Sequence, residues 1–437
     1  MPRAFSRLHP KLAEALSEKG WEATPVQENV IPQLIEGHDR LIVAPTGSGK
    51  TMAGILPLFH RCLTHEWSSL SILYITPLRA LNRDVDRRLR ELATAVGLRV
   101  DVRHGDTPQS QRTKQTRRPP NLLVTTPETF QLMFSGKNLR AMLSTVQAVV
   151  VDEVHDLAAS ERGWQLSVGL SRLETLTGRP VQRLGLSATV GNPSAVAAWL
   201  SPRDAQPLIT TGDRETLLSV ESPLTLPEDE IGYAEMALPS PKQHAAYRHL
   251  CSLIRTEAPC LLFVNSRSEA ETLTSRLQSM APDLNVGVHH GSLAAETRQQ
   301  MEDDLRDGRL SGLVCTSSLE LGIDVGSVRR ILQLHSPKSV DRMLQRVGRA
   351  DHRLGGVGRG HVVTWDIDHL LESAVVARRA MAGDIEPVEW RQRPLTIAAN
   401  QLVLMAHSFK AVSIDAATSM LAASPQFDGW DLSLIHI

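Results

Sequence analysis

The sequence predicts an α/β protein made of two tandem lobes, each built on a parallel sheet, followed by a shorter C-terminal segment. Two series of short β-type runs alternate with helical stretches, a pattern typical of parallel sheets covered by helices on both faces. A proline-rich and acidic stretch separates the two series. We therefore expect lobe 1, an exposed linker, lobe 2 and the start of a further domain over residues 1–215, 216–241, 242–385 and 386–437.

Composition limits the class of protein. The 437 residues are 42% hydrophobic and 22% charged, which is typical of a globular chain. The formal net charge is −1, so a surface that binds nucleic acid would have to come from local clusters. Four widely spaced cysteines argue against a zinc ribbon or an iron–sulfur cluster. Without a bilayer-length apolar run or the apolar core of a signal peptide, we expect a cytoplasmic protein with no membrane partner.

The segment A-P-T-G-S-G-K-T, residues 44–51, predicts a phosphate-binding loop. It follows the apolar run 41–43 and opens a helical stretch, whose N-terminus carries partial positive charge. Gly47 and Gly49 allow backbone N–H groups to converge on an anion. Lys50 is expected to reach the outer phosphates, and the Thr51 hydroxyl to hold Mg²⁺. The nucleotide-binding residues predicted here are Thr46, Gly47, Ser48, Gly49, Lys50 and Thr51; the usual first glycine is replaced by Ala44.

Asp152 and Glu153 follow the apolar run 148–151 and predict the metal and hydrolysis site. An aspartate at a strand tip can bind Mg²⁺, and the adjacent glutamate can orient or deprotonate a water. A helix cap is the alternative for such a pair seen alone, and the phosphate loop favours hydrolysis. Ser187, in the tripeptide S-A-T, could hydrogen-bond these carboxylates.

Other predicted strands of lobe 1 also end in polar motifs. T-P-L-R-A-L, with Pro77 and Arg79, and T-T-P-E, with Thr126, suit contacts to a sugar–phosphate backbone. Plain strand-to-helix turns are the alternative for either motif alone. Upstream of the phosphate loop, Gln27 could pair with an adenine edge, although a solvated helix residue is its simpler interpretation.

The second series of strands has no phosphate loop, so we expect lobe 2 to act on the nucleotide of lobe 1, in a cleft between them. Its strand ends carry N-S-R, H-H-G-S-L, T-S-S-L-E-L-G-I-D and Q-R-V-G-R-A. A helical spacing places Arg346 and Arg349 on one face, where arginine can neutralise charge on a phosphoryl group. Surface salt bridges are the alternative for any single arginine.

As an ordered set, these motifs resemble those of the superfamily two DExH-box helicases, over about residues 5–385. More narrowly, S-S-L-E-L-G-I-D-V-G and G-R-A-x-H-R before a glycine-rich loop resemble the Lhr (large helicase-related) family. The resemblance implies two RecA-like lobes, ATP and Mg²⁺ as cofactors, and 3′→5′ movement on single-stranded DNA. Residues 386–437 resemble the opening of that family's winged-helix domain, which we expect to be truncated.

The resemblance also assigns roles to individual residues. The implied catalytic residues are Lys50, Asp152, Glu153, Gln345 and Arg349. The phosphate loop would share the nucleotide with Gln27, Gly322, Asp324, Arg346, Arg349 and His352. Nucleic-acid contacts would come from Pro77, Arg79, Thr126, Arg267, His290, Gly291, Thr316 and Ser318. The chain departs from the common pattern at Asp351 and His352, which replace a glycine and an arginine and leave the residue that completes the arginine finger open.

These inferences predict an ATP-dependent helicase or translocase of single-stranded or branched DNA, active in DNA repair or processing. RNA or an RNA:DNA hybrid stays open as the partner, because backbone contacts discriminate poorly between sugars. A DExH RNA helicase, and a clamp that binds ATP and nucleic acid without separating strands, are the alternatives.

Overall fold

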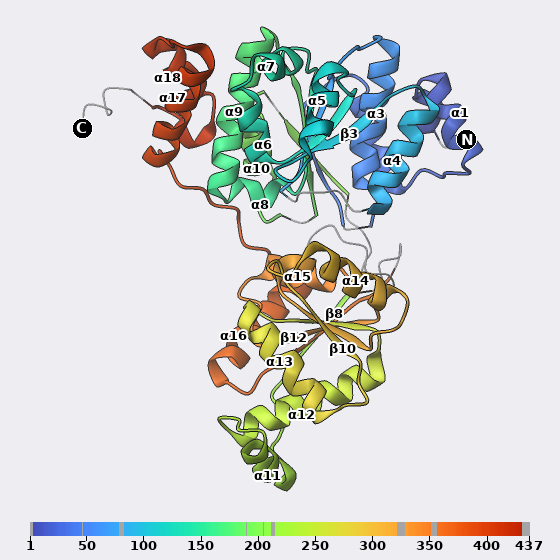
Figure 1. The fold of residues 1–437 in the computed structure, drawn as a ribbon, viewed down its shortest axis with the longest axis vertical. Helices are drawn as coiled ribbons and strands as arrows, with labels where there is room; N and C mark the ends of the chain where they lie inside the picture. The colour runs from blue at the N-terminus through green and yellow to red at the C-terminus, as the bar shows by residue number, and fades with distance from the viewer. Residues whose placement is uncertain are drawn as a thin grey trace. The chain divides into compact units, whose positions relative to one another are not determined.

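The computed structural model describes residues 3–45, 47–77, 83–188, 190–203, 205–210, 215–320, 328–350 and 356–430. The chain divides into two compact units (Figure 1). Unit 1 comprises Met1–Thr211 with Pro387–Ile437, and unit 2 comprises Gly212–Glu386. Within the described ranges, no helix has both the length and the apolarity needed to cross a bilayer.

Unit 1 is built on a seven-stranded parallel sheet with the strand order β3-β4-β2-β5-β6-β1-β7. Its strands are β1 (Arg40–Val43), β2 (Ile72–Ile75), β3 (Val100–Arg103), β4 (Leu122–Thr125), β5 (Ala148–Val151), β6 (Gln182–Ser187) and β7 (Gln206–Ile209). The central strands β2, β4, β5 and β6 are buried along their whole length. This confirms the predicted parallel sheet, since only strands covered on both faces read as continuous apolar runs.

Helices cover both faces of this sheet. They are α1 (Pro10–Glu18), α2 (Pro25–Leu34), α3 (Lys50–Thr64), α4 (Arg83–Ala95), α5 (Gln109–Arg117), α6 (Pro127–Met133), α7 (Lys137–Leu143), α8 (Val154–Ala158), α9 (Glu161–Thr177) and α10 (Pro193–Leu200). Successive strand residues point to opposite faces. Ile42 accordingly packs in the core with α1 to α4, and Leu41 and Val43 pack in the core with α6 to α10.

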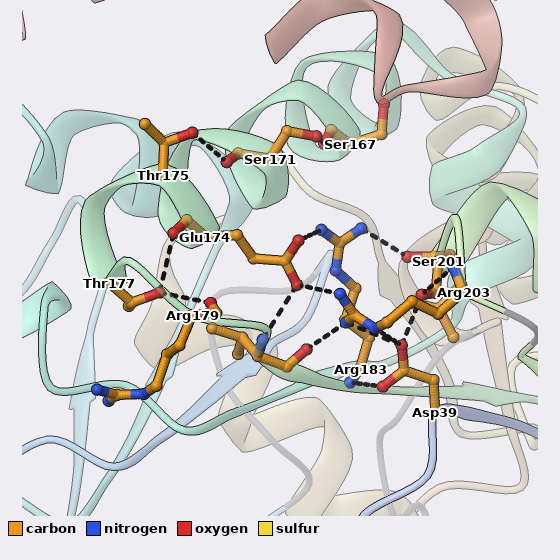
Figure 2. A network of polar contacts seen from close by, with 12 residues as sticks. Asp39, Ser167, Ser171, Glu174, Thr175, Thr177, Arg179, Arg183, Ser201 and Arg203 are labelled. Atoms are coloured by element: carbon orange, nitrogen blue, oxygen red, sulfur yellow. Dashed lines mark hydrogen bonds and ion pairs between the residues drawn. The ribbon is translucent and has the colours of Figure 1, made fainter. Parts of the chain in front are cut away.

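A buried charge network holds together the segments at the start of β1 and β6 (Figure 2). The Asp39 carboxylate accepts hydrogen bonds from the Arg183 backbone N–H (2.8 Å), the Ser201 hydroxyl (2.6 Å) and Arg203 Nε (2.9 Å). Glu174 of α9 pairs with Arg203 at 2.7 Å and with Arg183 at 2.9 Å. Two carboxylates therefore compensate two arginines, and each buried charge has a partner of opposite sign.

The C-terminal segment belongs to unit 1 and packs on α9 (Figure 1). It contains α17 (Leu395–Phe409), α18 (Ile414–Ala422) and a short 3₁₀ turn, Pro425–Phe427. Its core includes Ile397, Met405 and Phe427, which pack with Trp164 and Val168 of α9. That residues 386–437 open a winged-helix domain stays a prediction.

Unit 2 is built on a six-stranded parallel sheet with the strand order β10-β11-β9-β12-β13-β8. Its strands are β8 (Thr216–Glu221), β9 (Cys260–Phe263), β10 (Val286–His289), β11 (Gly312–Cys315), β12 (Arg330–Leu334) and β13 (Gly358–Val363). Its helices are α11 (Pro227–Glu235), α12 (Pro241–Glu257), α13 (Arg267–Met280), α14 (Ala295–Arg306), α15 (Val340–Val347) and α16 (Ile367–Met381). The structure thus contains the two parallel-sheet α/β lobes that the sequence predicts.

The interpretation of residues 216–241 as an exposed linker is wrong. Residues 216–221 form β8, the edge strand that pairs with β13 along its whole length. Residues Pro227–Glu235 form α11, in which Asp229 is fully buried. An edge strand alternates between partly buried and exposed side chains, as β8 does, so it lacks the continuous apolar run of the central strands. Pro227 and Pro241 occupy the first positions of helices, where proline is favourable, instead of marking a connector.

Candidate nucleotide and nucleic-acid sites

The predicted phosphate loop joins β1 to α3 at the carboxyl end of the unit 1 sheet, where parallel α/β sheets bind ligands. Gly47 and Gly49 have φ of 81° and 86°, in the left-handed region that favours glycine. The Thr24 hydroxyl donates to the Ser48 carbonyl at 2.7 Å. A Cβ on Gly49 would lie 2.7 Å from Gln27 Nε2, so the loop requires glycine there for space as well as for φ.

The Gln27 side chain hydrogen-bonds the predicted phosphate loop. Its side chain is 6% exposed and forms a capping box with Thr24 at the start of α2. The amide oxygen accepts from the Thr24 N–H at 3.1 Å, and Nε2 donates to the Gly49 carbonyl at 3.2 Å. The structure therefore assigns Gln27 a role in positioning the loop, and its contact with adenine stays a prediction.

Lys50 and Ser48 supply polar atoms that need a partner. The Lys50 Nζ and the Ser48 Oγ are buried, and neither makes a hydrogen bond within the described part of the chain. Lys50 Nζ lies 3.8 Å from Glu153 Oε1, beyond hydrogen-bonding distance. A buried ammonium without a hydrogen-bond acceptor is unfavourable, and phosphate oxygens would satisfy it. These residues thus fit a nucleotide phosphate; Thr46 lies outside the described residues.

Asp152 lies at the tip of β5, next to the phosphate loop. The Tyr74 hydroxyl donates to Oδ2 at 2.6 Å, and the Glu153 backbone N–H donates to Oδ1 at 3.0 Å. Burial, reinforced by the negative charge of Glu153, raises the pKa of Asp152 to about 6, although Lys50 opposes the shift. Burial also raises the pKa of Tyr74 well above its usual value, so this phenol stays a donor, and it contacts the Thr51 hydroxyl as well. Carboxylate and hydroxyl oxygens are the donors that Mg²⁺ prefers, so Asp152 and Thr51 fit this ion.

Glu153 stands in a strained backbone conformation at the start of α8. Its φ of 45° and ψ of 48° are left-handed, which is costly for a residue with a Cβ and concentrates at functional sites. His155 lies beside it, with Nδ1 2.9 Å from the Ser187 hydroxyl and 3.8 Å from Glu153 Oε2. The sequence predicted a hydrogen bond from Ser187 to the Asp152 or Glu153 carboxylate. Among the described contacts, the Ser187 hydroxyl bonds His155 instead.

The predicted nucleic-acid residues of unit 1 follow two neighbouring strands. Pro77 follows β2 and Thr126 follows β4, and an ion pair between Arg162 and Glu128 (2.5 Å) links these two ends. Arg162 also donates to the Pro77 carbonyl at 3.0 Å, and the Thr126 hydroxyl accepts from the Thr129 N–H at 3.4 Å. The sequence did not single out Arg162, because this residue of α9 belongs to none of the motifs. Arg79 lies outside the described residues.

Three adjacent strands of unit 2 bring its predicted nucleic-acid residues together. Arg267 follows β9, His290 and Gly291 follow β10, and Thr316 follows β11, in the strand order β10-β11-β9. Arg267 is exposed and donates to the Ser292 hydroxyl at 2.6 Å. These residues lie together at the carboxyl end of the unit 2 sheet, because neighbouring parallel strands end on the same side.

The histidines at this end of the unit 2 sheet form hydrogen bonds with other residues of unit 2. His290 is buried, with Nε2 3.0 Å from Glu271 Oε1. Ser318 lies 2.8 Å from His289 Nδ1, and the other ring nitrogen of His289 is 3.1 Å from Glu302. The contact that the sequence predicts between Ser318 and a nucleic acid therefore competes with a bond inside the unit.

The two predicted arginine-finger residues are buried. The Arg346 guanidinium bonds Glu320 Oε1 through Nε at 2.7 Å, bonds the Gln333 amide oxygen, and lies 5.1 Å from the centre of the Phe263 ring. Arg349 donates to the Glu320 carbonyl through Nε and Nη2 at 3.1 and 2.6 Å.

The predicted contact between Arg346 and the nucleotide finds no support in this geometry, because Glu320 neutralises its charge. Gln345 is also buried, on the same helix, α15. Three other predicted nucleotide-binding residues lie outside the described residues: Gly322, Asp324 and His352.

Comparison with known families agrees with this architecture. Residues 24–196 match the DEAD/DEAH box helicase model, and residues 245–355 match the helicase conserved C-terminal domain. The chain is 35% identical to an Lhr helicase/probable uracil glycosylase of Mycolicibacterium smegmatis over 92% of this chain and 30% of that protein. It is also 35% identical to the ATP-dependent helicase Lhr-Core of Methanothermobacter thermautotrophicus, over 92% of this chain and 49% of that one.

A more distant relative, the RNA helicase CrhR of Synechocystis, is 26% identical over 78% of this chain and 65% of its own length. Among solved structures, the Mycobacterium smegmatis helicase Lhr bound to ssDNA and AMP-PNP aligns with a TM-score of 0.87 at 35% identity. That alignment covers 99% of this chain and 57% of the other. The chain spans half or less of the length of the two Lhr proteins. Its two domain models and these relatives together place it in the Lhr family of DEAD/DEAH box helicases.

Proposed function

We propose that the chain is an ATP-dependent helicase or translocase that moves on single-stranded DNA. The observation that carries the proposal is the buried Lys50 ammonium, which makes no hydrogen bond within the described residues and lies 3.8 Å from Glu153, beside a glycine loop at the carboxyl end of the sheet. Such a pair places a phosphate-binding cation beside a carboxylate able to act on water. The Lhr relative bound to ssDNA and AMP-PNP supports both ligand classes.

In this proposal the residues of unit 1 bind ATP and Mg²⁺. Lys50, Ser48 and the loop N–H groups bind the phosphates, and Thr51 and Asp152 hold the ion. Mg²⁺ supplies neutralisation of phosphate charge when it is bound. Glu153 then orients a water and accepts its proton, and His155, held by Ser187, fixes the place of Glu153.

The residues of unit 2 that we propose for hydrolysis are Gln345 and Arg349. Arg267, His290, Gly291 and Thr316, together with Pro77 and Thr126 of unit 1, are the proposed backbone contacts to the strand. Movement in the 3′→5′ direction, a role in DNA repair or processing, and a cytoplasmic location are further parts of this proposal.

Steady-state ATPase assays with and without single-stranded DNA test the proposal. We expect stimulation by DNA, and a loss of about 10³-fold in kcat for Glu153→Gln and of comparable size for Lys50→Ala. Arg255→Gln is a matched control, because this exposed arginine of α12 pairs with the exposed Asp283 and belongs to none of the predicted motifs. ATP hydrolysis that survives both active-site substitutions would overturn the mechanism.

Strand displacement on partial duplexes with 3′ or 5′ tails, made of DNA and of RNA, tests the substrate and the direction. The similarity to the RNA helicase CrhR makes RNA the specific second candidate. Displacement of DNA from 3′-tailed substrates supports the proposal, and activity confined to RNA would replace it. DNA-stimulated hydrolysis without displacement of either duplex would indicate a translocase or clamp.

A further inference from the structure

Three side chains with metal-binding atoms meet in unit 2, apart from the helicase motifs. Glu221 is the last residue of the edge strand β8, His249 stands on α12, and His361 lies on β13. In the strand register, His361 is opposite Ser219, and Glu221 lies two residues further along β8. Residues two apart on a strand point to the same face, so this register directs Glu221 and His361 to one side of the sheet, where α12 supplies His249.

The distances between the donor atoms fit a shared ion. Glu221 Oε2 lies 3.2 Å from His249 Nε2 and 3.1 Å from His361 Nε2. All three donor atoms lie within 4.8 Å of one another. Bonds of about 2.0–2.1 Å to a tetrahedral ion place neighbouring donors roughly 3.3–3.4 Å apart. Two separations are therefore close to this value. The third, between the two imidazole nitrogens, is at most 4.8 Å and can shorten by rotation of the partly exposed His249 ring.

Both imidazole Nε2 atoms converge on the same Glu221 oxygen. Each is buried and is ion-paired with that oxygen, but neither meets it in an aligned hydrogen bond. His361 is 7% exposed, so water does not readily reach its ring. Buried polar atoms normally make well-directed hydrogen bonds, and a cation shared by these three groups would satisfy all of them.

The hydrogen bonds around His361 are compatible with a ligand tautomer. Its Nδ1 lies 2.8 Å from the Ser219 hydroxyl, which itself donates to the Gly360 carbonyl at 3.5 Å. When Nδ1–H donates to the Ser219 oxygen, the hydroxyl proton is left for the Gly360 carbonyl, and Nε2 carries the lone pair. This is the arrangement that second-shell bonds impose on metal-binding histidines.

The surrounding charges permit a cation. Arg330, at the start of the neighbouring strand β12, acts electrostatically on His361. The Arg330 guanidinium is paired with Glu257 at 3.0 Å, so its positive charge is locally compensated. The Glu221 carboxylate, in contrast, has the two imidazoles as its ion-pair partners among the described residues.

We propose that Glu221, His249 and His361 bind one divalent transition-metal ion, with Zn²⁺ the best match. Imidazole nitrogens and a carboxylate oxygen are ligands that Zn²⁺ accepts in four-coordinate sites, and the 46% exposed Glu221 side chain leaves the fourth position open to water. The ion joins the edge strand β8 to β13 and to α12. It therefore acts as a structural cross-link of unit 2, separate from ATP hydrolysis.

Zn²⁺ titration of the chelator-treated chain, in competition with a chromophoric chelator and in excess Mg²⁺, tests this site. We expect one tight Zn²⁺ per chain, a rise in melting temperature on Zn²⁺ addition, and an affinity reduced about 100-fold or more in His249→Gln and Glu221→Gln. Both substitutions alter partly exposed side chains, so folding is preserved and can be checked by circular dichroism. His361→Gln is a third variant.

His369→Gln is the matched control. His369 also lies near a histidine and a carboxylate, with its ring 4.5 Å from that of His335 and its Nδ1 3.8 Å from Glu372. Lys338 already neutralises Glu372 at 2.8 Å, so this cluster lacks the charge needed for a cation, and the control is expected to bind Zn²⁺ as the unmodified chain does. Absence of tight Zn²⁺ binding, or binding that persists unchanged in His249→Gln and Glu221→Gln, would overturn the proposal. DNA-stimulated ATPase activity, measured in the same variants, separates this result from failure of the proposed function.

Discussion

The Ser187 hydroxyl and His155 Nδ1 lie 2.9 Å apart in a buried contact that joins the end of β6 to α8. His155 is also 3.8 Å from Glu153 Oε2 and 3.6 Å from Asp156 Oδ1. The end of one strand thus sets the position of a histidine beside the carboxylate that we propose to act on water. Ser187, to which we assign no step in the proposed reaction, thereby influences the position of Glu153 through His155.

Replacing Ser187 with alanine is expected to lower the kcat of DNA-stimulated ATP hydrolysis about 10-fold, because His155 loses the bond that holds it beside Glu153. Nucleotide affinity should stay unchanged, since the described bond between Ser187 and the phosphate-loop segment joins its backbone carbonyl to the Ala44 N–H at 3.1 Å, and alanine keeps this bond. Steady-state kinetics and binding of a fluorescent ATP analogue measure the two quantities. Ser171→Ala is the control, because this buried hydroxyl bonds the Ser167 carbonyl within its own helix (Figure 2). An equal loss in both variants would show that Ser187 acts only through stability.

Replacing Gln27 with alanine is expected to weaken the binding of ATP and of GTP alike, by about 3–10-fold, because the Gln27 amide holds the Gly49 carbonyl and the Thr24 N–H. Equilibrium binding of both nucleotides measures this effect. Gln33→Ala is the control, since Gln33 lies on the same helix and bonds only the Asn29 carbonyl of that helix in the described contacts. A loss confined to ATP would instead assign Gln27 to the adenine ring.

Arg172→Met is expected to loosen the C-terminal segment. The fully buried guanidinium donates to Gln131 at 3.0 Å, and to Gln401 and Ser408 of α17 at 3.2 and 3.0 Å. Burial lowers the pKa of Arg172 to about 10, which still leaves it charged at neutral pH. Its removal leaves several buried acceptors without a donor, at a cost of roughly 2–4 kcal/mol.

Limited proteolysis and urea unfolding measure this effect. Cleavage within α17 and α18 should accelerate in Arg172→Met and stay slow in Thr175→Ala, a substitution on the same helix that removes only a bond to the Ser171 carbonyl. Unchanged protection of α17 in Arg172→Met would show that apolar packing alone docks the segment.

Asp229 predicts an acid-dependent stability of unit 2. Burial alone would raise the pKa of Asp229, but hydrogen bonds from Arg248, the Leu226 N–H and His244 lower it to about 2. A folded-state pKa below the unfolded value of about 4 adds stability that is complete above pH 4 and is lost as the pH falls toward 2. At neutral pH we expect Asp229→Asn to destabilise unit 2 by about 1–2 kcal/mol, a value reduced for the partial exposure of Arg248.

Urea unfolding at pH 7 and at pH 3 measures this difference. The gap between the unmodified chain and Asp229→Asn should narrow at pH 3, because the carboxyl becomes partly protonated in the unfolded state. Asp283→Asn is the control, since its ion pair with Arg255 is exposed and contributes little. A gap of the same size at both pH values would contradict the assigned role of Asp229.

The sequence by itself was sufficient to predict the two parallel sheets, and to place the glycine loop and the Asp152-Glu153 pair at the ends of strands. Each of these is encoded locally, by an apolar run followed at once by a glycine loop or by carboxylates, and a parallel sheet then brings such strand ends to one edge. The order of the motifs also identified the family, as the comparisons show.

Only the tertiary structure decided where residues distant in the chain meet. The sequence of β8 predicted a linker, and the structure shows that this segment pairs with β13 as an edge strand. The sequence also predicted that Arg346 contacts the nucleotide, and the structure shows its guanidinium bonded to Glu320. The same holds for Ser187 with His155, and for Arg172 with α17, 229 positions away at Gln401. Such contacts depend on packing between elements, for which a short stretch of sequence carries no periodic or spacing signal.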